Sequence, residues 1–284
     1  MACFPLGSDK SAWSHFTTAR YDAGDFKLAM TAMANGFRSM EPVLELPPVP
    51  TTRRKTFTST HSRPSLSLSI RLPVACVIAA GLCLPFLDYV VGRFCAVDWL
   101  PREIVRFLQT AEHFGTPFGQ LLVLGPIYCV YRGRFPQAVR ILLGAVSAGM
   151  AANVMKLMLS RSRPRAFDFD AASSIEFAGF QGWFPLGTNA AIHQSFPSSH
   201  TACAFAFAAL MTWAFPNGKW AFLTLATLCG IERIYTHAHF PSDVFIGAAI
   251  GWIIGNLFIS VPWLNTCFET REKAWLKRQE LKGQ

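Results

Sequence analysis

The chain has 284 residues, of which 51% are hydrophobic and only 15% are charged. A soluble domain of this size usually has about a quarter of its residues charged, so the composition favours an integral membrane protein. The formal net charge of +9 does not indicate nucleic-acid binding, because the basic residues form no stripe interleaved with aromatic side chains. Most of them lie in the tails and in connections between apolar runs, as the positive-inside rule describes.

Residues 1–70 differ from the rest of the chain. They are rich in Ser, Thr, Pro and charge, with Pro47-Pro48-Val49-Pro50 followed by Arg53-Arg54-Lys55, and they contain no apolar stretch typical of a signal peptide. This composition predicts a disordered, basic cytoplasmic tail. An alternative is that translation starts at Met33 or Met40. Residues 265–284 predict a second basic cytoplasmic tail.

Between the tails, residues 71–264 alternate apolar runs with charge, which predicts an all-α, polytopic membrane domain. The candidate spans are 72–91, 117–131, 138–158, 201–215, 219–236 and 243–263. Several are shorter than the ~20 residues that cross ~30 Å of hydrocarbon, and 117–131 is the weakest of them. With the N-terminal tail inside, the C-terminal tail is also cytoplasmic, and three clusters of basic and histidine residues lie together on the opposite face.

The first cluster contains Lys156 and Arg163, which are seven residues apart and so lie on one face of a helix. Pro164 disfavours helix at Arg163, so Arg163 is expected just past the end of the segment. Lysine binds phosphate as a point charge and arginine binds it bidentately. Taken alone, the pair indicates side chains that snorkel to the interface. That role is the one expected for the flanking Arg161 and Arg165.

The loop over residues 160–199 connects the first cluster to the second. Its aromatic residues are Phe167, Phe169, Phe177, Phe180, Trp183 and Phe184. This density of aromatics indicates a segment that lies in the membrane interface. An ordinary lid packed on the helix ends is the alternative. Both place the loop beside the clusters.

The second cluster is Pro197-Ser198-Ser199-His200. Pro197 suits the first turn of a helix, and Ser198 and Ser199 then offer N–H groups at a helix N-terminus, which is a ready anion site. A lone histidine such as His200 at a helix start is more often a cap or a packed polar residue. Its neighbouring clusters favour function instead.

The third cluster contains Arg233, His239 and Asp243. If Pro241 opens the last helix, the Asp243 carboxylate can reach back to a ring nitrogen of His239. That contact would fix the tautomer and leave the other nitrogen as a nucleophile. The alternative is a purely structural His–Asp hydrogen bond. Three cations and two imidazoles at a hydrocarbon edge together indicate a phosphate site.

The combined pattern Lys156-x6-Arg163-Pro164, Pro197-Ser198-Ser199-His200 and Arg233-x5-His239-x3-Asp243 resembles the three motifs of the phosphatidic acid phosphatase type 2 superfamily, which includes the vanadium haloperoxidases. The resemblance covers about residues 72–263. It implies a bundle of six transmembrane helices. It also implies a metal-independent phosphatase that needs no cofactor and acts on a membrane lipid phosphate or pyrophosphate.

The resemblance also implies roles for individual residues. His239 would attack phosphorus and form a phosphohistidine, Asp243 would orient His239, and His200 would protonate the leaving oxygen and later activate water. The phosphate oxygens would be held by Lys156, Arg163, Ser198, Ser199 and Arg233. Two positions depart from the family pattern: Ser199 stands where glycine is most common, and Glu232 stands where a small residue normally precedes the arginine.

The substrate candidates are phosphatidic acid, isoprenoid pyrophosphates, phosphatidylglycerophosphate and lipid A. In a bacterial inner membrane the site would face the periplasm. One alternative function is a phosphotransferase with the same machinery. Others are a vanadate-dependent oxidase, whose branch of the family is soluble, and a non-catalytic protein that binds lipid phosphates. A metal site built from His200, His237, His239 and Asp243 is disfavoured because the nearby cations would repel a metal ion.

Overall fold

The computed structural model describes residues 66–95, 100–130, 135–167, 169, 180–182 and 192–282. The predicted tail therefore lies outside the described residues up to position 65, and so does most of the aromatic loop. The first described helix begins at Leu66, inside the range assigned to the tail.

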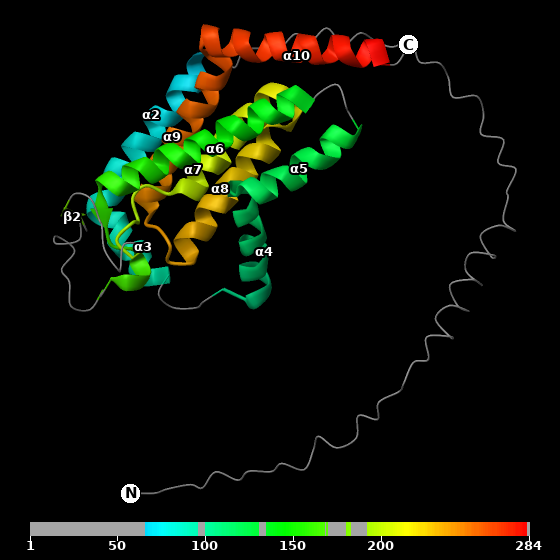
Figure 1. The fold of residues 1–284 in the computed structure, drawn as a ribbon. Helices are drawn as coiled ribbons and strands as arrows, with labels where there is room; N and C mark the ends of the chain where they lie inside the picture. Colours follow the sequence, from blue (N-terminus) through cyan, green and yellow to red (C-terminus); the bar gives the residue numbers. More distant parts are fainter. Residues whose placement is uncertain are drawn as a thin grey trace, which may run out of the picture. The chain divides into compact units, whose positions relative to one another are not determined.

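The described chain is built mainly of helices (Figure 1). In chain order they are α2 (Leu66–Leu82), α3 (Asp88–Cys95), α4 (Arg102–Glu112), α5 (Pro117–Val130), α6 (Phe135–Met158), α7 (Ser199–Ala214), α8 (Lys219–Tyr235), α9 (Pro241–Ser260) and α10 (Pro262–Lys282). A π turn over Cys83–Leu87 joins α2 to α3. Two short strands, β1 (Ser160–Arg161) and β2 (Phe180–Gly182), pair antiparallel and are the one departure from all-α structure in the described residues.

Each of the six predicted apolar segments overlaps at least one helix. Three helical stretches are long and apolar enough to cross a membrane, namely Ser69–Cys95, Phe135–Met158 and Pro241–Ser260. Outward-facing apolar side chains on the first stretch, such as Val77, Ile78 and Phe86, are more than half exposed, as expected for a surface in contact with lipid. The protein is thus a helical membrane protein, and the count of six spans remains a prediction.

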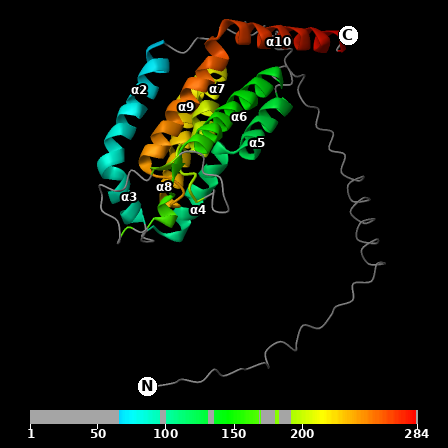
Figure 2. The same cartoon turned by 60° about the vertical axis from the view of Figure 1, so that its left-hand side comes forward.

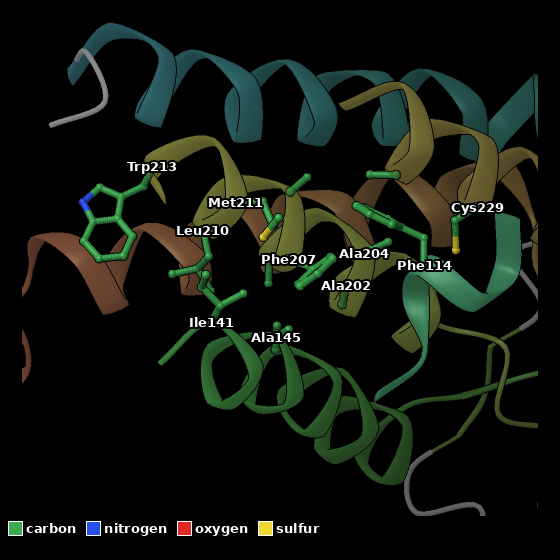
Figure 3. Close-up of a cluster of buried hydrophobic side chains, with 14 of the residues drawn as sticks. Phe114, Ile141, Ala145, Ala202, Ala204, Phe207, Leu210, Met211, Trp213 and Cys229 are labelled. Atoms are coloured by element: carbon green, nitrogen blue, oxygen red, sulfur yellow. The ribbon is translucent and has the colours of Figure 1, made fainter. Parts of the chain in front are cut away.

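Helix α7 lies at the centre of the core and packs against α6, α8 and α9. It is apolar on all sides, which is the pattern of a helix surrounded by others. Figure 3 shows its side chains Phe207, Leu210 and Met211 among residues of α6, α8 and the turn after α4. Both ends of α7 are therefore fixed by neighbouring helices.

A stripe of glycines allows α9 to approach the backbone of α7 closely. An added Cβ would lie 2.5 Å from the Ser198 carbonyl oxygen at Gly247, 2.2 Å from the Ala202 oxygen at Gly251, and 2.9 Å from the Ala206 oxygen at Gly255. Small residues at i, i+4 spacing are a common means of close helix packing in membranes. Here they hold the N-terminus of α7 against the N-terminus of α9.

Helix α10 crosses the end of the bundle that is opposite α3 (Figures 1 and 2). The fully buried Arg140 of α6 connects it to the bundle, because its guanidinium donates to the carbonyl oxygen of Phe258 and, 2.5 Å away, to Oδ1 of Asn265. The predicted C-terminal tail is therefore helical up to Lys282. Its packing leaves the α3 end of the bundle open for the three clusters.

Candidate active site

The three clusters meet at one end of the bundle, because α6 and α8 end there and α7 and α9 begin there. The backbone of residues 161–163 runs beside residues 192–195, with the N–H of Arg161 donating to the His193 carbonyl (2.8 Å) and the N–H of Ser195 donating to the Arg161 carbonyl (3.0 Å). This pairing brings the chain from the first cluster directly to the start of the second.

Contacts join every pair of clusters. Lys156 Nζ donates to Ser199 Oγ at 3.1 Å, which connects the first cluster to the second. The guanidinium of Arg163 contacts the Ala238 carbonyl oxygen at 3.4 Å, beside His239 of the third cluster. The second and third clusters are joined by the N–H of Ser198, which donates to the Asp243 carbonyl at 3.0 Å. The sequence-predicted residues therefore form one site.

Ser198 forms hydrogen bonds within the protein at the start of α7. Helix α7 begins at Ser199, with Ser198 as its N-cap, so the prediction that Pro197 occupies the first helical turn is wrong by two residues. The Ser198 hydroxyl accepts from Thr201 Oγ1 at 2.9 Å, and the side chain is fully buried. Ser199 lies beside a cavity of about 220 Å³ that is also lined by His200, Asn153 and Thr116.

His239 lies in the short connection between α8 and α9 and is only 2% exposed. The turn before it places His237 in the left-handed region, with φ of 55°. Burial, together with the cations Lys156 and Arg163, lowers the pKa of His239 to about 3, although the Asp243 carboxylate opposes this shift. The imidazole is therefore neutral at physiological pH in the substrate-free site, which is the form that a nucleophile needs.

Asp243 is positioned by several donors. Its Oδ2 accepts from the Ser195 hydroxyl at 2.5 Å and from the Phe240 N–H at 2.9 Å, and it lies 3.8 Å from His239 Nδ1. That last distance is longer than a hydrogen bond, so the carboxylate attracts the ring without a direct bond. His239 and Asp243 are neighbours as predicted, with Nδ1 facing the carboxylate, but the hydrogen bond that would fix the tautomer is not formed in this structure.

The expected role of Arg161 is wrong, because this side chain is fully buried instead of reaching the interface. One guanidinium nitrogen pairs with Asp243 Oδ1 and donates to Ser242 Oγ, and the other pairs with Asp88 Oδ2 at 2.8 Å. Asp88 is also buried and accepts from the Ser242 N–H at 2.9 Å. Arg161 therefore holds Asp243 through Oδ1, the oxygen other than the one nearest His239, and its pair with Asp88 connects the site to α3.

Two carboxylates contact Arg233. Glu232 pairs with Nε and its side chain is 1% exposed, while Glu112 Oε2 lies 2.6 Å from a terminal nitrogen. The other oxygen of Glu112 lies 3.4 Å from His200 Nε2. Burial, and after it the neighbouring cation Arg233, lowers the pKa of His200 to about 4, while the Glu112 carboxylate opposes this shift. The sequence alone did not single out Glu112, which precedes the site by more than forty residues.

Comparison with known proteins finds similar sequences. The family model described as PAP2 superfamily matches residues 137–267. The lipid A 1-phosphatase of Rhizobium etli is 36% identical over 107 residues, which is 37% of this chain and 42% of that protein. The lipid A 1-phosphatase of Porphyromonas gingivalis is 43% identical over 77 residues, or 26% of this chain and 17% of that protein. The chain thus spans less than half of the length of these relatives.

Two solved structures are also similar. Aquifex aeolicus LpxE has a TM-score of 0.41 and 25% identity, over 62% of this chain and 93% of that chain. A transmembrane PAP2 type phosphatidylglycerolphosphate phosphatase from Bacillus subtilis has a TM-score of 0.44 and 18% identity, over 72% of this chain and 98% of that chain. The matching family model and the similar sequences confirm the resemblance to the PAP2 superfamily for residues 137–267, which contain all three clusters.

Proposed function

We propose that this chain is a membrane phosphatase that hydrolyses a lipid phosphate or pyrophosphate through a phosphohistidine on His239. The relatives named lipid A 1-phosphatase make the 1-phosphate of a lipid A-type glycolipid the first substrate to test. The observation that carries the proposal is the convergence of two histidines, one orienting carboxylate and three cations at one end of a membrane helical bundle.

The nucleophile of the proposed reaction is His239 Nε2, since Nδ1 faces Asp243. Nε2 attacks phosphorus while the bond from phosphorus to the lipid oxygen breaks on the opposite side. The ring becomes positively charged as the N–P bond forms, and Asp243 stabilises that charge. Ser195, Phe240 and Arg161 keep the carboxylate in place by their contacts with it.

His200 carries the proton in both steps. Its ring is neutral in the empty site, and the negative charge of the bound phosphate raises its pKa, so that it enters the reaction protonated. It donates a proton to the departing lipid oxygen, and it then takes a proton from the water that attacks the phosphohistidine. The products are the lipid alcohol and inorganic phosphate, and His239 and His200 return to their starting forms. Charge on the phosphate oxygens is stabilised by Lys156, Arg163 and Arg233 together with the backbone N–H of Ser199, and fixed donors of this kind supply much of the catalysis in phosphoryl transfer.

The position of the site at the ends of apolar helices supports a lipid as the substrate. Lys156 is at the end of one apolar span and Asp243 is at the start of another, so a lipid can present its head group to the site while its chains remain in the bilayer. The positive-inside rule supports cytoplasmic tails and a site on the outer face, which is the periplasmic face if the membrane is a bacterial inner membrane.

The test is release of inorganic phosphate by the detergent-purified chain with EDTA present, from lipid A 1-phosphate, phosphatidic acid, phosphatidylglycerophosphate and an isoprenoid pyrophosphate. His239→Ala is compared with His113→Gln, a change at an exposed histidine. We expect release by the native chain and by the His113 variant and none by His239→Ala. Equal release by all three proteins contradicts the proposal. Phosphoryl transfer to an added alcohol without free phosphate would instead identify a phosphotransferase.

A further inference from the structure

Glu112 is the last residue of α4, and its carboxylate lies between two predicted functional groups. One oxygen is 2.6 Å from Arg233 and the other is 3.4 Å from His200 Nε2. The side chain therefore contacts both a cation expected to bind phosphate and the histidine expected to protonate the leaving group. A spectator carboxylate on a helix surface would not contact both.

The two carboxylates on Arg233 differ in their exposure to solvent. Glu232 is adjacent in the chain, pairs with Nε and is 1% exposed. Glu112 pairs with a terminal nitrogen, and its side chain is 28% exposed. Because guanidinium groups bind carboxylates and phosphates with the same geometry, the position that Glu112 occupies on Arg233 is one that a phosphate oxygen would take.

The backbone next to Glu112 is packed closely on α7, whereas the Glu112 side chain is partly exposed. In the turn that follows, an added Cβ at Gly115 would lie 2.5 Å from the His200 carbonyl oxygen, so this turn is packed directly on α7. A carboxylate at the C-terminal end of a helix also faces the negative end of the helix dipole. The position of Glu112 is thus unfavourable for α4 by itself, and the cations of the site compensate for it.

We propose that Glu112 occupies a phosphate-oxygen position on Arg233 in the substrate-free enzyme, and that it then acts as a positioning residue for His200 when phosphate displaces it. This inference rests on the proposed function. The carboxylate gives up Arg233 and keeps its contact with His200 Nε2. In protonated His200 the Nε2–H then donates to Glu112, and the Nδ1–H is the proton that goes to the leaving oxygen. Its charge also repels bound phosphate, and this repulsion promotes release of the product.

The experiment measures both effects in full-length protein purified in detergent. The variant Glu112→Gln keeps the shape of the side chain and removes its charge. The matched control is Glu103→Gln, because Glu103 is on the same helix, is 80% exposed and pairs only weakly with Arg106 at 3.5 Å. Inorganic phosphate binding is measured by calorimetry, and kcat and KM are measured on the best lipid substrate.

We expect Glu112→Gln to bind inorganic phosphate about tenfold more tightly, which corresponds to about 1.4 kcal/mol, and to lower kcat about tenfold or more because His200 loses its partner. Glu103→Gln should change neither value. An unchanged or weaker phosphate affinity in Glu112→Gln would overturn the proposal. A merely structural role would lower stability and kcat without tightening phosphate binding.

If Glu112→Gln does not give folded protein, Glu112→Asp replaces it. This change withdraws the carboxylate by one methylene from both partners, so phosphate should bind more tightly than in the native chain, and equal affinity would overturn the inference. Failure of the proposed function is distinguishable, because the native chain would then release no phosphate from any lipid. The calorimetric comparison would still decide whether Glu112 competes for Arg233.

Discussion

Replacing Arg161 with Met removes a buried cation that two buried carboxylates share. In the native chain one guanidinium nitrogen pairs with Asp243 and the other pairs with Asp88. The variant leaves both carboxylates in an apolar interior, where their mutual repulsion and loss of hydration are uncompensated. We therefore expect a large loss of stability and, because Asp243 is no longer fixed beside His239, a large loss of turnover.

The size of the effect follows from the complete burial of all three side chains. Removal of one partner from a buried ion pair costs about 3–5 kcal/mol. In a domain of 150–250 residues each kcal/mol lowers Tm by roughly 2–4 °C, so the expected decrease is roughly 6–20 °C. The Tm of Arg161→Lys should lie between those of the native chain and Arg161→Met, because one ammonium cannot donate in the two fixed directions of a guanidinium.

The assay is thermal unfolding in detergent together with phosphate release, and Arg165→Met is the control. Arg165 is another arginine of the same segment, but its side chain is exposed, so its replacement should change stability by no more than about 0.5 kcal/mol. The reasoning is refuted if Arg161→Met melts at the same temperature as Arg165→Met and retains native turnover.

Three further predictions use other contacts. Gly251→Ala places a Cβ 2.2 Å from the Ala202 oxygen, so it should separate α9 from α7 and lower both Tm and activity. Gly81→Ala, where a Cβ would have nothing within 4 Å, should lower neither. Equal Tm and activity in the two variants would contradict the close packing. Ser199→Gly removes the hydroxyl that accepts from Lys156 Nζ, so phosphate no longer has to displace this contact. KM should fall by about two- to twelvefold, the equivalent of the net 0.5–1.5 kcal/mol of one hydrogen bond. An unchanged or higher KM in steady-state kinetics would contradict this prediction. The folded-state pKa of His239, about 3, is below its unfolded value of about 6.5, so the unfolded chain alone binds this proton between these pH values. Stability is therefore lost as pH falls below about 6.5, and melting curves of His239→Gln should show a smaller decrease between pH 7 and pH 5; parallel pH profiles would refute the assignment.

The sequence was sufficient to predict a helical membrane protein, and it also predicted which residues lie together at one end of the bundle. Apolar runs bounded by charge identify helices without tertiary information. Lys156, His200 and His239 could be found because histidines and cations are costly at a hydrocarbon edge and have few uses there. Convergence of the clusters followed from a topology that places their helix ends on one face.

The partners that support the site could not be predicted in the same way. Asp88 is 73 residues from Arg161 in the chain, and no spacing rule relates the two. The only available signal was a single carboxylate inside the apolar segment 72–91, which is costly unless it is paired. Arg161 and Arg165 have the same side chain and are four residues apart, so only the pairing of residues 161–163 with 192–195 determines which of them points inward.

The charges of the site divide into two groups with different consequences for catalysis. The first group is Arg161 with Asp88 and Asp243, all fully buried. Two carboxylates and one guanidinium give it a net negative charge, which stabilises positive charge on His239. Lys156 and Arg163 contact neutral oxygens of Ser199 and Ala238, and these contacts are cheaper to exchange for phosphate than ion pairs are. Arg233 is intermediate between the two groups. Its ion pair with the buried Glu232 resembles those of Arg161, whereas Glu112 holds it only until an anion arrives. A site of this kind remains nearly neutral when it is empty. Arg233 becomes available to an anion only when the partly exposed Glu112 carboxylate leaves it while keeping its contact with His200.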